Sequence, residues 1–201
     1  MSSIFTTPVL TPALRTLAKG ALRACGWRVE GNDQMTPPFV FIGAPHTSNW
    51  DFLLLVAAML TLKLDARWIG KHTLFRFPFG GLMRWMGGIP VNRSNAHNRV
   101  ADLIAAFAQN PALIICISPE GTRKKVGRWH TGFYRIACGA GVPIHMAVID
   151  AEHKELRSLG IFHPSGDVDR ELPLIQRHYR GFHGLRPENA CDFNNLPDDM
   201  G

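Results

Sequence analysis

The chain has 201 residues, of which 46% are hydrophobic and 19% are charged. This composition can bury a sizeable core and argues against an intrinsically disordered chain. The 22 Lys and Arg residues exceed the 16 Asp and Glu residues, and the net charge of +6 is compatible with nucleic acid, an anionic membrane surface or acidic partners. The longest apolar run, Phe52 to Leu62, is shorter than a membrane-spanning helix, so we expect no transmembrane span.

The N-terminus and the cysteines indicate a cytoplasmic protein. Prolines and cations interrupt the first apolar run, unlike in a secretory signal: Pro8, Pro12, Arg15 and Lys19. The four cysteines are widely spaced and include no Cys-x-x-Cys pair: Cys25, Cys116, Cys138 and Cys191. This spacing indicates neither a zinc cage nor a disulfide framework, so we expect reduced thiols and no bound metal.

Residues 1–37 are predicted to contain a basic amphipathic helix. Between Leu10 and Arg28, apolar residues recur at near-helical spacing, and cations four residues apart lie on another side. Such a helix is either an ordinary surface helix or one that lies in a lipid interface, where Lys and Arg are typical of the polar face. Membrane contact by this segment therefore stays open.

Residues 38–150 form the predicted core, in which strand and helix patterns alternate. In chain order the patterns predict a strand at Pro38–Gly43, a helix at Trp50–Leu62, strands at Ala66–Gly70 and Gly88–Asn92, a helix at Ser94–Gln109, a strand at Ala112–Ile117, a helix at Gly132–Cys138 and a strand at Val142–Ile149. The alternation predicts an α/β fold, a single domain with a mostly parallel central sheet flanked by helices. The signal weakens after Asp150, and residues 151–201 are expected to pack on the core as an extension with a frayed end.

A His and an Asp separated by four residues can form a general base in which the carboxylate orients the imidazole. The chain has three such pairs: His46 and Asp51, His97 and Asp102, and His145 and Asp150. The third pair straddles a predicted strand, where an odd separation places side chains on opposite faces. The second lies in a predicted helix, where five residues place the side chains about 140° apart. Only the first pair lies in a turn, where its side chains can meet.

Asp51 has a second interpretation. Ser48-x-x-Asp51 before an apolar run also resembles a capping box, in which Asp51 bonds to backbone at the start of the helix. A His directly after a buried strand, however, lies where open α/β sheets place their functional sites. Helix capping and orientation of His46 therefore remain two interpretations of the same carboxylate.

Two segments that follow or form strands have the composition of a phosphate site. After the strand that ends at Ile117 come a carboxylate, a flexible Gly and three cations: Glu120, Gly121, Arg123, Lys124 and Lys125. Arg matches phosphate oxygens with a planar fork of donors, and Gly allows backbone N–H groups to approach closely. Gly88 to Arg93 repeats the arrangement, although Arg93 alone is also explained as a surface residue. Lys124 and Lys125 are better explained as a solvated basic loop.

Aromatic and basic residues are interleaved between Arg67 and Trp85, and Pro78, Gly80 and Gly81 interrupt them. Core packing explains some of the aromatic residues, but an interfacial surface or an acyl-chain groove fits the mixture better. Single-stranded nucleic acid is a further alternative for such a mixture. The residues expected to contact a membrane or an acyl chain are Trp68, Lys71, Phe75, Phe77, Phe79 and Trp85.

Taken together, four ordered blocks resemble those of the glycerolipid acyltransferases, the lysophosphatidic acid acyltransferase family. They are His46-Thr-Ser-Asn-Trp-Asp51, Gly88-Ile-Pro-Val-Asn-Arg93, Pro119-Glu-Gly-Thr-Arg123 and Val142-Pro143-Ile144. The resemblance extends from about Phe39 to Ile149, and the residues around His46 resemble a compact bacterial branch.

The resemblance implies a fatty acyl transfer from acyl-CoA or acyl carrier protein to a lysophospholipid hydroxyl, with lysophosphatidic acid as the expected acceptor. In that family the His of block one is the base and its Asp orients it, which assigns these roles to His46 and Asp51. The resemblance further assigns the acceptor to Gly88, Arg93, Glu120, Gly121, Thr122 and Arg123, and pocket shape to Pro143. It implies no cofactor or metal, no nucleic acid, and a peripheral position on the inner face of the cell membrane.

The blocks depart from the family pattern at Ser118, Pro90 and Met146, which affects the identity of the acceptor more than the reaction class. Two other functions remain open from the sequence. One is a non-catalytic basic module that binds anionic lipid or nucleic acid, whose binding would fall steeply with salt. The other is a lipid thioester or ester hydrolase in which His46 activates water.

Overall fold

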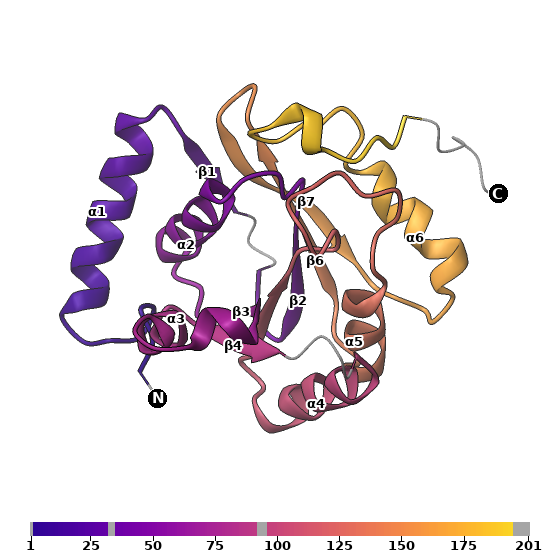
Figure 1. Ribbon diagram of the computed structural model, residues 1–201, viewed down its shortest axis with the longest axis horizontal. Coiled ribbons are helices and arrows are strands. Elements are labelled where there is room, and N and C mark those ends of the chain that lie inside the picture. The colour runs from indigo at the N-terminus through magenta and orange to yellow at the C-terminus, as the bar shows by residue number, and fades with distance from the viewer. Residues whose placement is uncertain (1, 32–34, 92–95, 195–201) are drawn as a thin grey trace.

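The computed structural model describes residues 2–31, 35–91 and 96–194, without the side chains of residues 96–98 (Figure 1). A seven-stranded sheet in the order β1-β7-β6-β2-β5-β3-β4 forms its centre. Neighbours among the last five strands are parallel: β6 (Ile144–Asp150), β2 (Phe39–Ala44), β5 (Ile114–Ile117), β3 (Ala66–Lys71) and β4 (Gly88–Val91). The predicted α/β fold with a mostly parallel sheet flanked by helices is therefore confirmed.

Two strands at one end of the sheet were absent from the prediction. β7 (Glu155–Phe162) runs antiparallel to β6, and β1 (Arg28–Glu30) pairs in parallel with β7. β7 is only half-buried along most of its length and so lacks a continuous apolar run. The helix predicted to continue to Arg28 ends at Ala24, because Gly26 adopts a φ of +78° and turns the chain toward the sheet.

Helices cover both faces of the sheet (Figure 1). α1 (Leu10–Ala24) and α2 (Trp50–Leu62) lie on one face, and α4 (Ala96–Gln109), α5 (Gly132–Ala140) and α6 (Val168–Arg177) lie on the other. A 3₁₀ turn, η1 (His72–Phe75), and the short helix α3 (Gly80–Trp85) connect β3 to β4, and a second 3₁₀ turn, η2 (Pro187–Asn189), follows α6. None of the helices in the described part of the chain combines the length and apolar character needed to cross a bilayer.

The central strands separate two apolar clusters, one on each face of the sheet. Along β2, Phe39 and Phe41 pack toward α2, whereas Val40 and Ile42 pack toward α5 and α6. Because a parallel strand covered on both sides reads as a continuous apolar run, β2 and β5 were readily predicted. Beyond β7, Ile175 and Tyr179 are fully buried against the second cluster. The end of the chain was expected to fray from Asp192 to Gly201, but Phe193 packs against Trp129, and residues 195–201 lie outside the described residues.

The carboxyl ends of the parallel strands meet at one edge of the sheet. β2 leads there into the His46 loop (residues 45–49), and its neighbour β5 leads into the Glu120 loop (residues 118–131). The register of β2 and β5 pairs Ile42 with Ile117, so the two loops leave the sheet side by side. Segments that are 74 residues apart in the sequence therefore meet at this edge, as at the ligand sites of other open α/β sheets.

Candidate functional site

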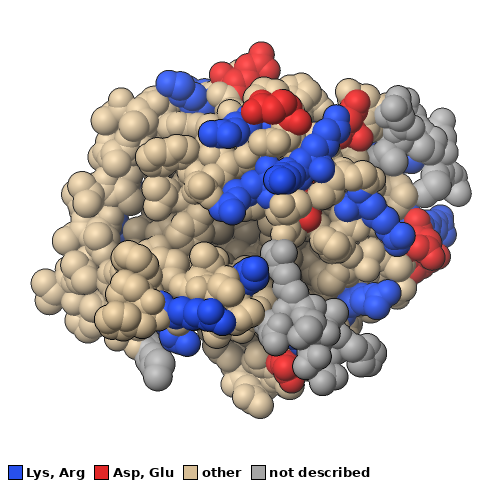
Figure 2. Space-filling model, in the orientation of Figure 1, with Lys and Arg blue, Asp and Glu red and all other residues tan. Residues whose placement is uncertain are grey.

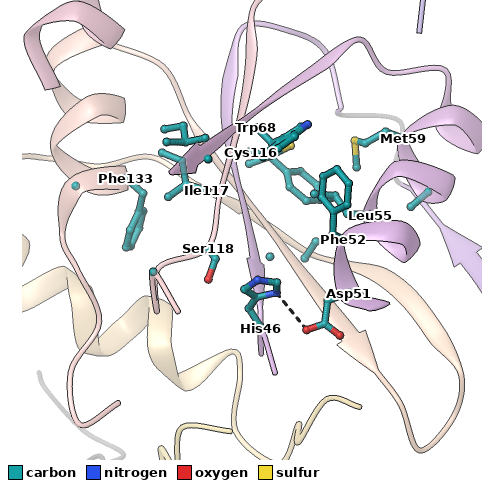
Figure 3. Close-up of a pocket in the computed structure, with 18 of the residues that line it drawn as sticks. His46, Asp51, Phe52, Leu55, Met59, Trp68, Cys116, Ile117, Ser118 and Phe133 are labelled. Carbon is teal, nitrogen blue, oxygen red and sulfur yellow. Dashed lines mark hydrogen bonds and ion pairs between the residues drawn. The ribbon is translucent and has the colours of Figure 1, made fainter. Parts of the chain in front are cut away.

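His46 and Asp51 meet at the carboxyl edge of the sheet. His46 follows β2, and Asp51 lies in the first turn of α2, with its Oδ2 3.1 Å from Nδ1 of His46 (Figure 3). Asp51 is buried, whereas the imidazole keeps about a quarter of its surface exposed. The carboxylate can therefore orient the ring, while the ring remains open to a bound molecule.

The capping interaction is also present at Asp51. Its Oδ2 accepts the backbone N–H groups of Thr47 at 2.6 Å and Ser48 at 2.7 Å. The bond from Ser48 is one half of the predicted capping box, although the residue that precedes α2 is Asn49. The two interpretations of Asp51 are thus compatible, because one oxygen accepts both backbone donors and faces the imidazole.

Glu120 holds the backbone of His46 from the neighbouring loop. Its Oε2 accepts the N–H of His46 at 2.6 Å and lies 3.4 Å from Oγ of Ser118. Burial raises the pKa of the Glu120 carboxyl to about 7, and the bond from His46 opposes part of this increase. The structure therefore places Glu120 behind the base, in contact with its main chain.

The remainder of the Glu120 loop lines the site. Gly121, Thr122 and Arg123 border the same cavity as His46, and Arg123 donates a hydrogen bond to Oδ1 of Asn49. Gly121 has a φ of +64°, and a Cβ there would lie 3.0 Å from the His130 ring, so both conformation and space favour Gly. Arg123 is exposed and placed at the entrance, where an anionic group could reach it.

A cavity of about 1720 Å³ opens beside His46, larger than the roughly 300–1,000 Å³ that is typical of a small-molecule pocket. One part extends between α2 and the sheet, along Phe52, Leu55 and Met59 on the helix and Trp68 on β3 (Figure 3). Another part reaches Phe133 of α5. The site thus joins a partly exposed imidazole and a cation to a long apolar recess.

Several predicted site residues lie away from His46. Gly88, at the start of β4, allows close packing, since a Cβ there would come within 2.7 Å of Phe75 and Trp68. Pro143 precedes β6, and its carbonyl accepts the N–H of Val40 near the start of β2, at the opposite edge of the sheet. The structure does not bring these two residues to the base. Arg93 lies outside the described residues.

The aromatic and basic segment divides into two groups. Trp68 and Phe75 stack on each other, and the indole N–H groups of Trp68 and Trp85 donate to the carbonyl of Met86 and to Thr7. Phe77, Phe79 and Lys71 are exposed, and Phe77 is 98% accessible to solvent. Three of the six expected contact residues therefore serve the interior of the protein, although Trp68 also lines the cavity.

The exposed aromatic residues belong to an apolar rim that the sequence did not reveal in full. We define the apolar rim as the exposed residues of α2, η1 and α3 with the turn between them: Trp50, Leu53, Leu74, Phe77, Phe79 and Leu82. Leu53, Leu74 and Leu82 also line the cavity, so the rim adjoins its mouth. Figure 2 shows Lys and Arg side chains on two sides of the hollow.

The surroundings of three other titratable groups, His145, Asp150 and Cys116, indicate a structural role. His145 is fully buried against the ring of Phe39, and Asp150 instead contacts Nδ1 of His153 at 2.9 Å, so the third His–Asp pair does not meet, as predicted. Burial raises the pKa of the Cys116 thiol to about 12, which leaves it protonated at neutral pH. In the described ranges, no group of three or more His, Cys, Asp or Glu residues is placed to hold a metal ion.

Three contacts at the site had no clear sequence signal. Asn49 holds Arg123, Ser118 approaches Glu120, and Thr47 contacts residues beyond position 183. Asn49 and Thr47 lie inside the block from His46 to Asp51, so their place in the sequence is the one signal that points to them. Their partners lie 74 or more residues away, and no local pattern could predict that these residues would meet.

The sequence matches the family model described as Acyltransferase over residues 27–150. It is 29% identical over 137 residues to a 1-acyl-sn-glycerol-3-phosphate acyltransferase of Haemophilus influenzae, which covers 64% of this chain and 55% of that protein. It is 33% identical over 109 residues to the protein of that name in Escherichia coli, with 50% and 42% of the two chains covered. The chain thus spans about half the length of the curated relatives it matches.

The fold resembles the crystal structure of the 1-acyl-sn-glycerophosphate (LPA) acyltransferase PlsC from Thermotoga maritima. The TM-score is 0.57, the sequence identity is 17%, and the match covers 84% of this chain and 76% of the other. At this identity the likeness concerns the arrangement of helices and strands. It covers a larger share of the chain than the family model does.

Proposed function

This chain belongs to the acyltransferase family, whose model covers more than half of its residues, and we propose that it transfers a fatty acyl group from a thioester to a lysophospholipid hydroxyl. Lysophosphatidic acid is the proposed acceptor, and acyl-CoA or acyl carrier protein is the proposed donor. The observation that carries this proposal is the His46–Asp51 pair at the mouth of an apolar cavity. The names of the relatives support the same reaction class.

In the proposed reaction His46 is the general base. A proton on Nδ1 faces Asp51, which leaves Nε2 with a lone pair for the acceptor hydroxyl. As Nε2 takes the hydroxyl proton, the acceptor oxygen forms a bond to the thioester carbonyl carbon and the C–S bond breaks. The imidazolium then returns the proton to the thiolate, so the free thiol leaves and the enzyme is regenerated.

The two parts of the site suit the two substrates. The recess along Phe52, Leu55 and Met59 offers apolar surface for the acyl chain of the donor. Arg123 at the entrance can donate to the acceptor phosphate, and Arg93 is proposed to help it because of its place in the second block. Glu120 fixes the backbone of the base, which we propose as its part in the acceptor site.

The test is acyl transfer from palmitoyl-CoA to lysolipids with and without a phosphate group. His46→Ala should lower kcat by about 10²- to 10⁴-fold, because the base contributes that factor. His153→Ala is the matched control: its imidazole also bonds to a buried Asp but lies outside the cavity lining, so it should retain the wild-type rate. Arg123→Ala and Arg93→Ala should raise KM for phosphorylated acceptors about tenfold and leave other acceptors unchanged.

The outcomes separate the alternatives. Wild-type activity in His46→Ala would remove the proposed base. Release of free fatty acid without an acceptor would indicate a hydrolase instead. Absence of transfer from both palmitoyl-CoA and a palmitoyl carrier protein would favour a non-catalytic module that binds anionic lipid or nucleic acid.

We also propose that the apolar rim rests on a membrane surface at the inner face of the cell membrane. The proposed lysophospholipid acceptor and the phospholipid product reside in bilayers, and the rim adjoins the mouth of the cavity. Exposed Phe and Trp residues beside Lys and Arg are typical of proteins that lie at the headgroup level. This contact is peripheral, through side chains of α2, η1, α3 and the turn between η1 and α3.

A further inference from the structure

We infer that residues 184–193, which we call the C-terminal strap, position the His46 loop and the Glu120 loop against each other. The strap includes η2 and lies outside residues 27–150, the part that matches the family model. In Figure 1 this segment, coloured yellow, passes over the edge of the sheet where both loops emerge. The inference rests on the proposed function, because it assigns a task in placing the proposed base.

The first set of contacts holds Thr47, the residue after the base. The N–H of Arg186 donates to Oγ1 of Thr47 at 3.1 Å, and Nδ2 of Asn189 donates to the carbonyl of Thr47 at 3.3 Å. Gly184, with a φ of +67°, lies so close that a Cβ would be 2.9 Å from Oγ1 of Thr47. The strap thus contacts both the side chain and the main chain of Thr47.

The same residue is tied to the base pair from the other side. The N–H of Thr47 donates to Oδ2 of Asp51, the oxygen that faces His46. Thr47 is only 2% exposed, so solvent offers little replacement for these bonds. A shift of Thr47 would therefore displace the His46 backbone and the Asp51 carboxylate together.

The second set of contacts holds the Glu120 loop. Sγ of Cys191 lies 3.3 Å from the carbonyl of Val126, and the ring of Phe193 packs edge-on against Trp129 at 5.1 Å. The adjoining His130 donates its N–H to the carbonyl of Pro119, the residue before Glu120. The C-terminal strap therefore contacts both loops. The distance between these loops determines the 2.6 Å hydrogen bond between Glu120 and His46.

Asn189 is the positioning residue that can be tested alone, because it reaches Thr47 through its side chain. Asn189→Leu keeps a similar size and removes the donor, and Asn189→Gln restores one. Glu188→Leu introduces the same new side chain at the exposed neighbouring position and is the matched control. Gly184→Ala is a second, independent disturbance of Thr47.

Two measurements test the inference in the full chain. Asn189→Leu should lower kcat about ten- to a hundredfold with KM nearly unchanged, since a small misplacement of a catalytic group has effects of that size, and the melting temperature should fall by only a few degrees. Hydrogen–deuterium exchange of peptides that cover residues 45–51 should rise about tenfold, because the amides of Thr47 and Ser48 are held by Asp51. Asn189→Gln should recover part of both values, and Glu188→Leu should change neither.

Unchanged kcat and unchanged exchange in both Asn189→Leu and Gly184→Ala would overturn the inference. So would a rise in KM at the wild-type kcat, which would assign the strap to substrate binding, or an equal rise of exchange throughout the chain, which would indicate general loss of stability. If the wild type transfers no acyl group, the proposed function fails, and the exchange of residues 45–51 still decides whether the strap positions the loop.

Discussion

Two buried carboxyl groups lie within reach of His46, and their surroundings differ. Asp51 accepts two backbone N–H groups and faces the imidazole through a single oxygen. Glu120 accepts one short bond from the His46 backbone, and burial raises its pKa to about 7. Asp51 touches the imidazole ring, whereas Glu120 touches only the backbone of His46. Asp51 therefore suits orientation of the ring, and Glu120 suits placement of the residue that carries it.

The raised pKa of Glu120 predicts a pH dependence of stability. A Glu carboxyl with an ordinary pKa of 4.5 releases its proton between pH 4.5 and 7 in the unfolded chain but retains it in the folded chain. The folded state then binds more protons, so the free energy of unfolding falls as pH rises through this window. Glu120→Gln keeps an oxygen acceptor for His46 and cannot ionise. The free energy of unfolding of this variant should therefore not fall in this pH window through residue 120.

Urea unfolding at pH 4.5 and pH 7.5 measures the difference. The stability of Glu120→Gln relative to wild type should increase by on the order of 3 kcal/mol between the two pH values, because the pKa of the Glu120 carboxyl is raised from 4.5 to about 7 in the folded chain. Glu188→Gln, at an exposed position, is the control and should follow the wild-type curve. Parallel curves for Glu120→Gln and wild type would contradict a raised pKa at this carboxyl.

At the scale of elements, η1, α3 and the turn between them present apolar side chains outward. Phe75 and Trp68 fill the space beneath, while Phe77 and Phe79 extend into solvent. Exposed aromatic residues gathered in one place are typical of interaction surfaces. The short connection between β3 and β4 thus combines a packed inner side with the outer part of the apolar rim.

Substitutions in the apolar rim should weaken membrane binding without unfolding the protein. Phe77→Ser and Phe79→Ser should each lower the affinity for vesicles that contain anionic phospholipid by about tenfold, because an inserted Phe gains roughly 1.5–3 kcal/mol by burial. Sedimentation with vesicles measures the bound fraction. Leu17→Ser, at an exposed position on α1, tests the amphipathic helix as the alternative contact. Loss of binding only in Leu17→Ser would place the contact on α1.

Sequence reasoning succeeded where the information was local. The continuous apolar runs of β2 and β5 predicted those strands, the helix at α2 was also predicted, and the turn between β2 and α2 predicted the approach of His46 and Asp51. β7 was not predicted because it is half-buried, and α3 was not predicted because six residues contain little periodicity. The bond from His46 to Glu120 depends on the pairing of β2 with β5, which no local pattern contains.

At the scale of the whole molecule, the net charge of +6 adds a long-range attraction to the apolar contact. Lys and Arg side chains border the hollow on the face shown in Figure 2. Attraction between a basic surface and anionic lipid extends about one Debye length, roughly 10 Å at 0.1 M salt, and contributes about 1 kcal/mol for each cation near the surface. The net charge and the apolar rim therefore contribute to binding of the same membrane surface, but the two contributions depend differently on the salt concentration.

The salt dependence of vesicle binding should separate the two contributions. Binding of the wild type to anionic vesicles should weaken at least tenfold between 0.05 and 0.5 M salt, as screening shortens the range of attraction. Phe77→Ser should lower affinity by a similar factor at both salt concentrations. Neutral phosphatidylcholine vesicles are the control, and salt should change the binding of the protein to them little. Equal salt dependence on neutral and anionic vesicles would contradict the electrostatic contribution.

The hydrogen bond between Thr47 and Asn189 joins residues 142 positions apart, and this separation has a consequence for synthesis. A ribosome adds residues from the N-terminus, so His46, Asp51 and Glu120 all leave it well before the C-terminal strap does. Until residue 193 has emerged, the contacts that hold the His46 loop are missing. Nascent chains stalled before residue 184 are therefore expected to bind lipid through their apolar residues yet transfer acyl groups slowly, so that the full rate is reached only once the strap has been released.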